Sequence, residues 1–265
     1  MTAGFIREIT SMSNDTVKMV RSLHLRKDRE ASGLFLAEGL KIATEAMQLG
    51  YAPQVLMFGP DAAGHPLLQQ LAQHTLAHGG DVAQVTRDIL EKVSRRDNPQ
   101  MVIAIFPQFY RDLSSLQPDD ATCWVALQAV RDPGNLGTIV RTADAAGCGG
   151  VILVGDCCDA FSVEAVRATM GSIFATPIYR ATVPEFIAWR ARWPGAVIGT
   201  LLSATEDFRT APYRSPNLIL MGNEQQGLPQ ELADLCDVNV KIPMRGRADS
   251  LNLSVATGVM IYAAT

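Results

Sequence analysis

The sequence has no hydrophobic run of the length that a membrane-spanning helix needs. Its N-terminal segment, MTAGFIREITSMSND, also lacks the apolar core of a signal peptide. The composition, with 48% hydrophobic and 19% charged residues, is typical of a globular protein and excludes an intrinsically disordered one. We therefore expect a cytoplasmic protein without a membrane partner.

Metal-ligand patterns are missing too. No cysteine pair forms C-x-x-C, and no histidine lies near a cysteine in a ligand pattern. The adjacent Cys157 and Cys158 suit neither a structural disulfide nor a zinc site. The five cysteines are therefore expected to be reduced thiols, and no metal is expected; they are Cys123, Cys148, Cys157, Cys158 and Cys236.

Several catalytic signatures are also absent. The sequence contains neither G-x-G-x-x-G nor G-x-x-x-x-G-K-[ST], and neither G-x-S-x-G nor H-E-x-x-H. All four histidines precede residue 80, so the C-terminal part has no histidine base. These absences exclude most hydrolases and metalloenzymes. A nucleotide-dependent oxidoreductase remains an alternative, although the glycine fingerprint of that class is missing. The net charge of −4 disfavours non-specific nucleic-acid binding but is compatible with a local basic patch.

What the sequence does contain is a regular alternation of apolar strand-like runs and helical patterns. A chain of 265 residues suits one large domain or two ordinary ones. The first unit, residues 1–107, is predicted to be a smaller α/β sandwich. Its strands are expected at 33–39, 54–59, 81–86 and 100–106, and its helices at 40–50, 66–80 and 87–94, with a basic amphipathic helix and turn over residues 13–30.

A polar segment with two prolines, residues 108–121, is predicted to be a linker. The second unit, residues 122–265, has near-continuous apolar strands between helices, which indicates a parallel sheet covered on both faces. Its strands are expected at 123–130, 149–155, 175–180, 195–202, 217–222 and 238–243. Its helices are expected at 135–147, 162–170, 184–193, 229–235 and 252–264.

Open parallel sheets bind ligands outside the carboxyl ends of their strands, where three segments of the second unit carry glycine and defined polar side chains. Arg141 follows the turn sequence DPGN, and a helix-face salt bridge is its alternative explanation. Glu224 lies in GNEQQGLP, where it either serves the site or caps the next helix or meets a surface arginine. Ser250 and Asn252 open an apolar helix, for which either is also a suitable N-cap.

Together these segments resemble the three signature motifs of the SpoU/TrmH branch of the SPOUT RNA methyltransferases. The resemblance covers residues 122–264, and residues 1–107 more loosely resemble an L30e-like RNA-binding domain. The matching stretches are DPGNLGTIVRTADAAG (132–147), LILMGNEQQGL (218–228), VKIPMRGRADSLNLSVATGVMIY (240–262), VRATMGSIFATPI (166–178) and, in the first unit, FLAEGLKIATEAM (35–47).

The resemblance implies a C-terminal trefoil knot, which periodicity alone cannot reveal. It implies S-adenosylmethionine as the cofactor, and a homodimer through the catalytic domain in which both chains complete each active site. The residues implied to hold the cofactor are Thr200, Leu201, Met221, Gly222, Ile242, Pro243, Met244 and Leu251.

The implied reaction is methylation of a ribose 2′-OH, a very weak acid whose developing charge needs stabilisation. A guanidinium stays protonated in proteins, so Arg141 is expected to lower the pKa of the 2′-OH electrostatically rather than to act as a base. The residues implied to orient Arg141 and the ribose are Asn135, Glu224, Ser250 and Asn252.

Ribosomal RNA is the favoured substrate because a separate domain precedes the catalytic one; transfer RNA, and a non-catalytic RNA-binding or assembly protein, are the alternatives. Residues 13–30 are expected to contact the RNA. The alternative is a solvated helix face, because acidic residues are interleaved with the basic ones. Val163 and Glu164 stand where many relatives have Pro-Lys, which bears on substrate choice. The predicted RNA contacts are Lys18, Arg21, Arg26, Lys27 and Arg29, with Arg95 and Arg96 nearby.

Overall fold

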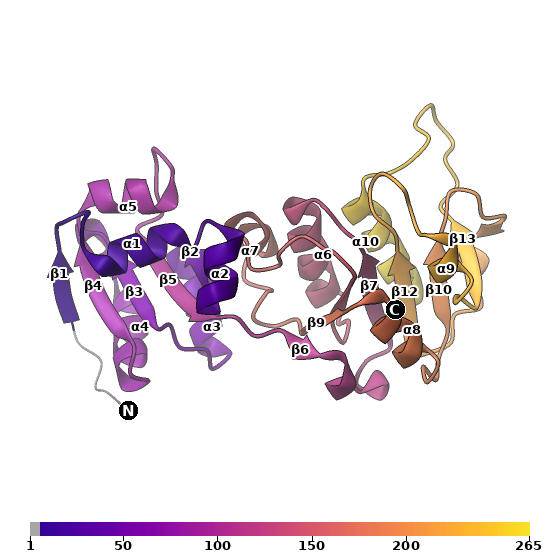
Figure 1. Cartoon of the computed structure of the whole chain (residues 1–265), viewed down its shortest axis with the longest axis horizontal. Helices are drawn as coiled ribbons and strands as arrows, with labels where there is room; N and C mark the ends of the chain where they lie inside the picture. The colour runs from indigo at the N-terminus through magenta and orange to yellow at the C-terminus, as the bar shows by residue number, and fades with distance from the viewer. Residues whose placement is uncertain (1–5) are drawn as a thin grey trace. The chain divides into compact units, whose positions relative to one another are not determined.

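The computed structural model describes residues 6–265, which form two compact units (Figure 1). Unit 1 contains the chain up to residue 108 together with residues 161–174. Unit 2 contains residues 109–160 and 175–265. In the part of the chain that the structure describes, no helix combines the length and the hydropathy needed to span a membrane.

Unit 1 is built on a mixed five-stranded sheet in the order β1-β4-β3-β5-β2. β1, β4 and β3 run parallel, and β5 is antiparallel to both β3 and β2. The predicted strands are present, and β1 is an additional one. The strands are β1 (Ile6–Ile9), β2 (Leu34–Glu38), β3 (Val55–Phe58), β4 (Asp81–Val85) and β5 (Val102–Pro107).

Two pairs of helices pack in unit 1, α1 with α5 and α3 with α4. The helix and turn expected over residues 13–30 are two helices, which are separated by an extended Leu25 (φ −94°, ψ 130°). The helices are α1 (Asp15–Ser22), α2 (Arg26–Ser32), α3 (Leu40–Gln48), α4 (Pro66–Ala77), α5 (Arg87–Ser94) and α7 (Val163–Thr169), with a 3₁₀ turn η1 (Pro60–Ala62).

Unit 2 contains an eight-stranded sheet in the order β11-β13-β10-β12-β7-β8-β9-β6, in which every pairing is parallel. Every residue of β8 and β12 is buried, so both faces of the sheet are covered. The strands are β6 (Arg111–Asp112), β7 (Cys123–Gln128), β8 (Val151–Val154), β9 (Ile178–Ala181), β10 (Val197–Thr200), β11 (Glu206–Asp207), β12 (Asn217–Met221) and β13 (Val238–Lys241). The predicted fold class, α/β with a parallel sheet and a smaller N-terminal unit, is confirmed.

Helices and short turns cover this sheet. α8 and α9 contribute Phe186 and Leu232 to a core that also contains Trp124, whereas α6 packs against α10. The helices are α6 (Pro133–Ala145), α8 (Val183–Arg190), α9 (Gln230–Ala233) and α10 (Leu253–Ala264), and the 3₁₀ turns are η2 (Leu113–Ser115), η3 (Pro118–Asp120) and η4 (Phe208–Thr210).

The segment expected to be a linker, residues 108–121, packs in unit 2 along part of its length. β6 pairs with β9 as an edge strand of the sheet. Leu113 and Leu116 are buried in the same core as Trp124. The segment packs against unit 2 because these two leucines bury apolar surface, although most of its other residues are polar.

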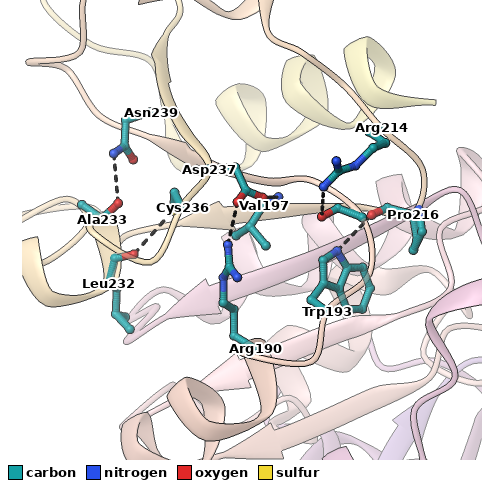
Figure 2. Close-up of polar contacts among 11 residues, drawn as sticks. Arg190, Trp193, Val197, Arg214, Pro216, Leu232, Ala233, Cys236, Asp237 and Asn239 are labelled. Carbon is teal, nitrogen blue, oxygen red and sulfur yellow. Dashed lines mark hydrogen bonds and ion pairs between the residues drawn. The ribbon is translucent and has the colours of Figure 1, made fainter.

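The amino ends of β10, β12 and β13 are fastened by side chains (Figure 2). Asp237 accepts hydrogen bonds from the backbone N–H of Val197 (2.8 Å) and from Nη2 of Arg190 (2.9 Å). Trp193 Nε1 donates to the carbonyl of Pro216 at 2.9 Å. These contacts fix one end of the sheet, and the loops at its opposite, carboxyl end form the candidate site.

Candidate active site

The loops that follow β10, β12 and β13 surround a cavity of about 770 Å³. Seven of the eight residues implied to hold a cofactor line this cavity; Pro243 does not. Glu224, Ser250 and Asn252 line it too, whereas Asn135 and Arg141 are outside the lining. The seven are Thr200, Leu201, Met221, Gly222, Ile242, Met244 and Leu251.

The lining combines apolar and polar side chains with backbone that a ligand can approach closely. A Cβ at Gly222 would lie 2.0 Å from the carbonyl carbon of Gly227, so only glycine fits this tight turn. Thr200 Oγ1 is buried and has no hydrogen-bond partner in residues 6–265. A buried, unpaired hydroxyl at a cavity wall is suited to a ligand with a neutral polar edge.

Glu224 binds the loop after β7 rather than capping α9 or meeting an arginine side chain. Its two carboxylate oxygens accept from the backbone N–H groups of Arg131 (3.2 Å) and Asp132 (3.3 Å), and from Nδ2 of Asn135 (3.1 Å). Partial burial acts to raise the pKa of Glu224, but these hydrogen bonds outweigh it and hold the pKa below its usual value. Glu224 is therefore ionised and joins the first and second motifs.

Asn135 and Asn252 join the first and third motifs. Asn252 Nδ2 donates to Asn135 Oδ1 at 2.9 Å. The other amide atom, Asn252 Oδ1, caps α10 by accepting from the backbone N–H of Ser254 at 2.9 Å. The N-cap explanation offered for Asn252 is therefore confirmed, and the same side chain also contacts Asn135. Ser250 is exposed, and its hydroxyl lies 3.4 Å from a carboxylate oxygen of Asp249.

Arg141 lies in the third turn of α6 and is exposed. It makes no hydrogen bond or ion pair with any residue between 6 and 265, so the helix-face salt bridge is absent. The helix begins earlier than expected because Asp132 caps it, accepting from the backbone N–H of Asn135 at 2.6 Å. The guanidinium of Arg141 is thus free for a partner from outside this chain.

The loop after β8 supports the loop that Glu224 binds, a role that the sequence pattern did not predict. Asp156 forms an ion pair with Arg131 at 3.1 Å. The backbone N–H of Cys158 donates to the carbonyl of Val130 at 2.8 Å. Burial, followed by the nearby charges of residues such as Glu224, raises the pKa of the Cys158 thiol to about 12, so it is neutral.

The predicted RNA contacts of unit 1 differ in availability. Arg29 is 3% exposed and donates to the carbonyl of Leu23 at 2.7 Å, so it cannot reach a partner at the surface. Lys18 pairs with Asp15 and Arg26 with Glu30. Arg21 and Lys27 are exposed, without an ion pair in the described chain.

No group of three or more metal-ligating side chains comes together in the part of the chain that the structure describes. Lys241, which was not predicted, lines the cavity as the last residue of β13. The site is therefore a cavity lined by backbone, apolar and polar side chains, with Glu224 and Lys241 as its charged residues and an exposed Arg141 on α6.

This chain belongs to the SpoU rRNA methylase family, whose model matches residues 122–262. Residues 14–104 match a second model, the MRM3-like substrate binding domain. The resemblance seen in the three motifs is thereby confirmed.

The chain is similar along nearly its whole length to individual members. It is 30% identical to the 23S rRNA (guanosine(2553)-2'-O)-methyltransferase RlmP of Bacillus subtilis, over 97% of this chain and 98% of that protein. It is 29% identical to a 23S rRNA (uridine(2479)-2'-O)-methyltransferase of Streptomyces viridochromogenes, over 97% and 91% of the two chains. The crystal structure of an AdoMet-bound rRNA methyltransferase from Sinorhizobium meliloti superposes with a TM-score of 0.92 at 47% identity, covering 98% of this chain and 97% of that one.

Proposed function

We propose that this protein transfers a methyl group from S-adenosylmethionine to a ribose 2′-oxygen of ribosomal RNA. The observation that carries the proposal is the network of Glu224, Asn135 and Asn252, which links the loops after β7, β12 and β13 beside the cavity. The family and the names of its members support the reaction and its RNA substrate. Transfer RNA is the nearest alternative substrate.

The cavity residues fit S-adenosylmethionine. Apolar side chains such as Leu201 and Ile242 suit the two faces of an adenine, and the unpaired hydroxyl of Thr200 and the exposed backbone at Gly222 suit polar edges. When bound, the cofactor supplies an electrophilic methyl group. In the proposal it is held by Thr200, Leu201, Met221, Gly222, Ile242, Pro243, Met244 and Leu251.

The side chains around the cavity position the nucleophile. Glu224 fixes the loop that carries Asn135, and Asn135, Ser250 and Asn252 orient the ribose and Arg141. A guanidinium stays protonated in proteins, so Arg141 stabilises the negative charge that develops on the 2′-oxygen, and the proton of the 2′-OH passes to water or to a phosphate of the RNA. Its freedom from partners within residues 6–265 suits this role.

The proposal includes a homodimer through the catalytic domain, with each site completed by both chains. Large apolar side chains are exposed on and just before α10: Leu251 at 39%, Val255 at 52% and Tyr262 at 63%. Such a row suits burial against a partner surface. α10 packs against α6, the helix that carries Arg141, so a partner at this surface lies close to the catalytic arginine.

The proposed division of labour follows the sequence. Residues 1–107 hold the RNA, residues 108–121 connect, and residues 122–265 carry catalysis and the trefoil knot. Because ribosomal RNA is the proposed substrate, the proposed location is the cytoplasm.

The experiment that tests the proposal is methyl transfer from labelled S-adenosylmethionine into total RNA, followed by separation of the large ribosomal, small ribosomal and transfer RNAs. We expect label on a ribose of one ribosomal RNA, and none with Arg141→Ala. Label in transfer RNA would show that transfer RNA, and not ribosomal RNA, is the substrate. Cofactor binding without any label, on naked RNA or on ribosomal particles, would indicate a binding protein, and failure to bind the cofactor would overturn the proposal.

A further inference from the structure

Arg95 is a basic residue in a backbone conformation that favours glycine. It forms the C-cap of α5 with φ 56°, and its side chain is exposed. A non-glycine residue rarely adopts this conformation, and its presence in a native fold is a reason to ask what the side chain does. Neither Arg95 nor Arg96 makes a side-chain hydrogen bond or ion pair in the described chain.

The C-terminal ends of α1 and α5 are held together in unit 1. The two helices pack against each other, and they lie side by side in Figure 1. His24, just after α1, places Nε2 at 2.6 Å from the carbonyl oxygen of Val93 near the end of α5. Arg21 lies in the last turn of α1 and is exposed. We call the group of Arg21, Arg95 and Arg96 the basic junction.

The basic junction has three guanidinium groups and one exposed carboxylate beside them, Asp97, which forms no ion pair with them in residues 6–265. Two other nearby carboxylates have partners. Glu91 on α5 pairs with Arg87 at 3.1 Å, and Glu38 at the end of β2 pairs with Arg167 at 2.8 Å. Helix dipoles favour cations at C-terminal ends, but that effect requires neither a strained conformation at Arg95 nor two adjacent arginines. An unpaired set of guanidinium groups is suited to phosphate, which it binds through two parallel hydrogen bonds.

We propose that the basic junction binds the phosphate groups of the RNA backbone and is the main electrostatic contact of unit 1 with the substrate. This inference rests on the proposed function. Of the contacts predicted in residues 13–30 it keeps Arg21 and adds Arg95 and Arg96. The others are less suited, because Arg29 is buried and Lys18 and Arg26 are paired with acids.

The test uses the full-length protein and a 23S ribosomal RNA transcript, with the dissociation constant measured between about 50 and 200 mM KCl. Arg95→Gly removes the guanidinium and leaves the residue that the backbone prefers, so the thermal midpoint should be unchanged or higher while RNA affinity falls. In the double variant Arg95→Gly/Arg96→Ala, the slope of log affinity against log salt should drop by about 0.7–0.9 for each phosphate that the protein no longer neutralises.

Two matched controls belong to the same unit. Met170→Gly makes the same backbone change, because Met170 caps α7 with φ 53° and is exposed. Lys41→Gln removes a cation of the same unit that pairs with Glu45 on α3. Neither control should change the affinity or the salt slope.

The outcomes separate this proposal from the proposed function. If the Arg95 variants keep the wild-type affinity and salt slope while the wild type methylates RNA, the basic junction is not the contact. An equal loss of affinity in Lys41→Gln would also overturn it, because the effect would then be one of overall charge. If the wild type binds S-adenosylmethionine but neither binds nor methylates RNA, the proposed function fails, and this inference fails with it.

Discussion

At the scale of single residues, the side chain of Asn252 takes part both in a helix cap and in the hydrogen-bond network beside the cavity. One amide atom caps α10, and the other binds Asn135, which in turn binds Glu224. An N-cap oxygen and a hydrogen-bond donor on the same side chain are a combination that asparagine offers and aspartate does not. The sequence pattern identified Asn252, but it could not decide between a helix N-cap and a site residue. Either role is satisfied by an asparagine at this position.

Asn252→Asp separates these two roles. Aspartate caps a helix as well as asparagine, so the thermal midpoint should stay near that of the wild type. The donor to Asn135 is replaced by a carboxylate facing its oxygen, so kcat/KM for methyl transfer should fall by about 10- to 100-fold. Asn252→Ala should lose activity and also about 1 kcal/mol of stability. Full activity in Asn252→Asp would show that the contact with Asn135 does not matter for catalysis.

Arg141 allows a second test at this scale. If its charge stabilises the developing oxyanion, Arg141→Lys should keep measurable activity, whereas Arg141→Ala should lose about 10²–10³-fold in kcat. Arginine and lysine side chains are both ordinarily charged at neutral pH, so the pH profile of the lysine variant should have the same shape there as that of the wild type. Equal losses in the two variants, measured by single-turnover methyl transfer, would contradict a simple charge role.

At the scale of elements, the sequence predicted the long or strongly apolar segments and missed the short ones. The six long strands of unit 2 were predicted from runs of buried residues, whereas β6 and β11 have two residues each and no periodicity to detect. Residues 13–30 were predicted to be a helix and turn, whereas the structure has a second helix, α2, after the extended Leu25. The loops of the site were predicted because they carry glycine together with Asn, Glu, Arg and Ser side chains, which a loop that only connects two elements does not require.

His24, which joins α1 to α5, gives a pH-dependent prediction at this scale. Burial is the main cause that lowers the pKa of His24 below 6.5, and the charge of Arg95 lowers the pKa further. The unfolded chain therefore binds more protons than the folded one just below that pH, so the free energy of unfolding should rise with pH through this window. Urea unfolding at several pH values should show this rise, and it should be absent in His24→Gln. A rise of equal size in the variant would assign it to other groups.

At the scale of the whole molecule, the two compact units do not coincide with the two consecutive segments, residues 1–107 and 122–265, that the sequence predicts. Residues 161–174 lie within the stretch that matches the methylase model, between β8 and β9, yet they pack in unit 1. Phe161 stacks on Phe35 with ring centroids 4.6 Å apart, and Phe174 meets Phe106 at 4.8 Å. Periodicity predicted a helix at 162–170, but it cannot say which hydrophobic core a helix joins.

The aromatic core of unit 1 should therefore depend on a segment that comes late in the chain. Phe174 is 4% exposed and also lies 5.2 Å from the ring of Tyr51, so Phe174→Ala should cost about 3–5 kcal/mol of stability. Hydrogen exchange should then accelerate first in β2 and β5 of unit 1. The matched variant Phe186→Ala, in the core of unit 2, should instead loosen β8 and β9. If Phe174→Ala loosened β8 and β9 before β2 and β5, residues 161–174 would owe their stability to the methylase sheet, and the first unit would be complete without them.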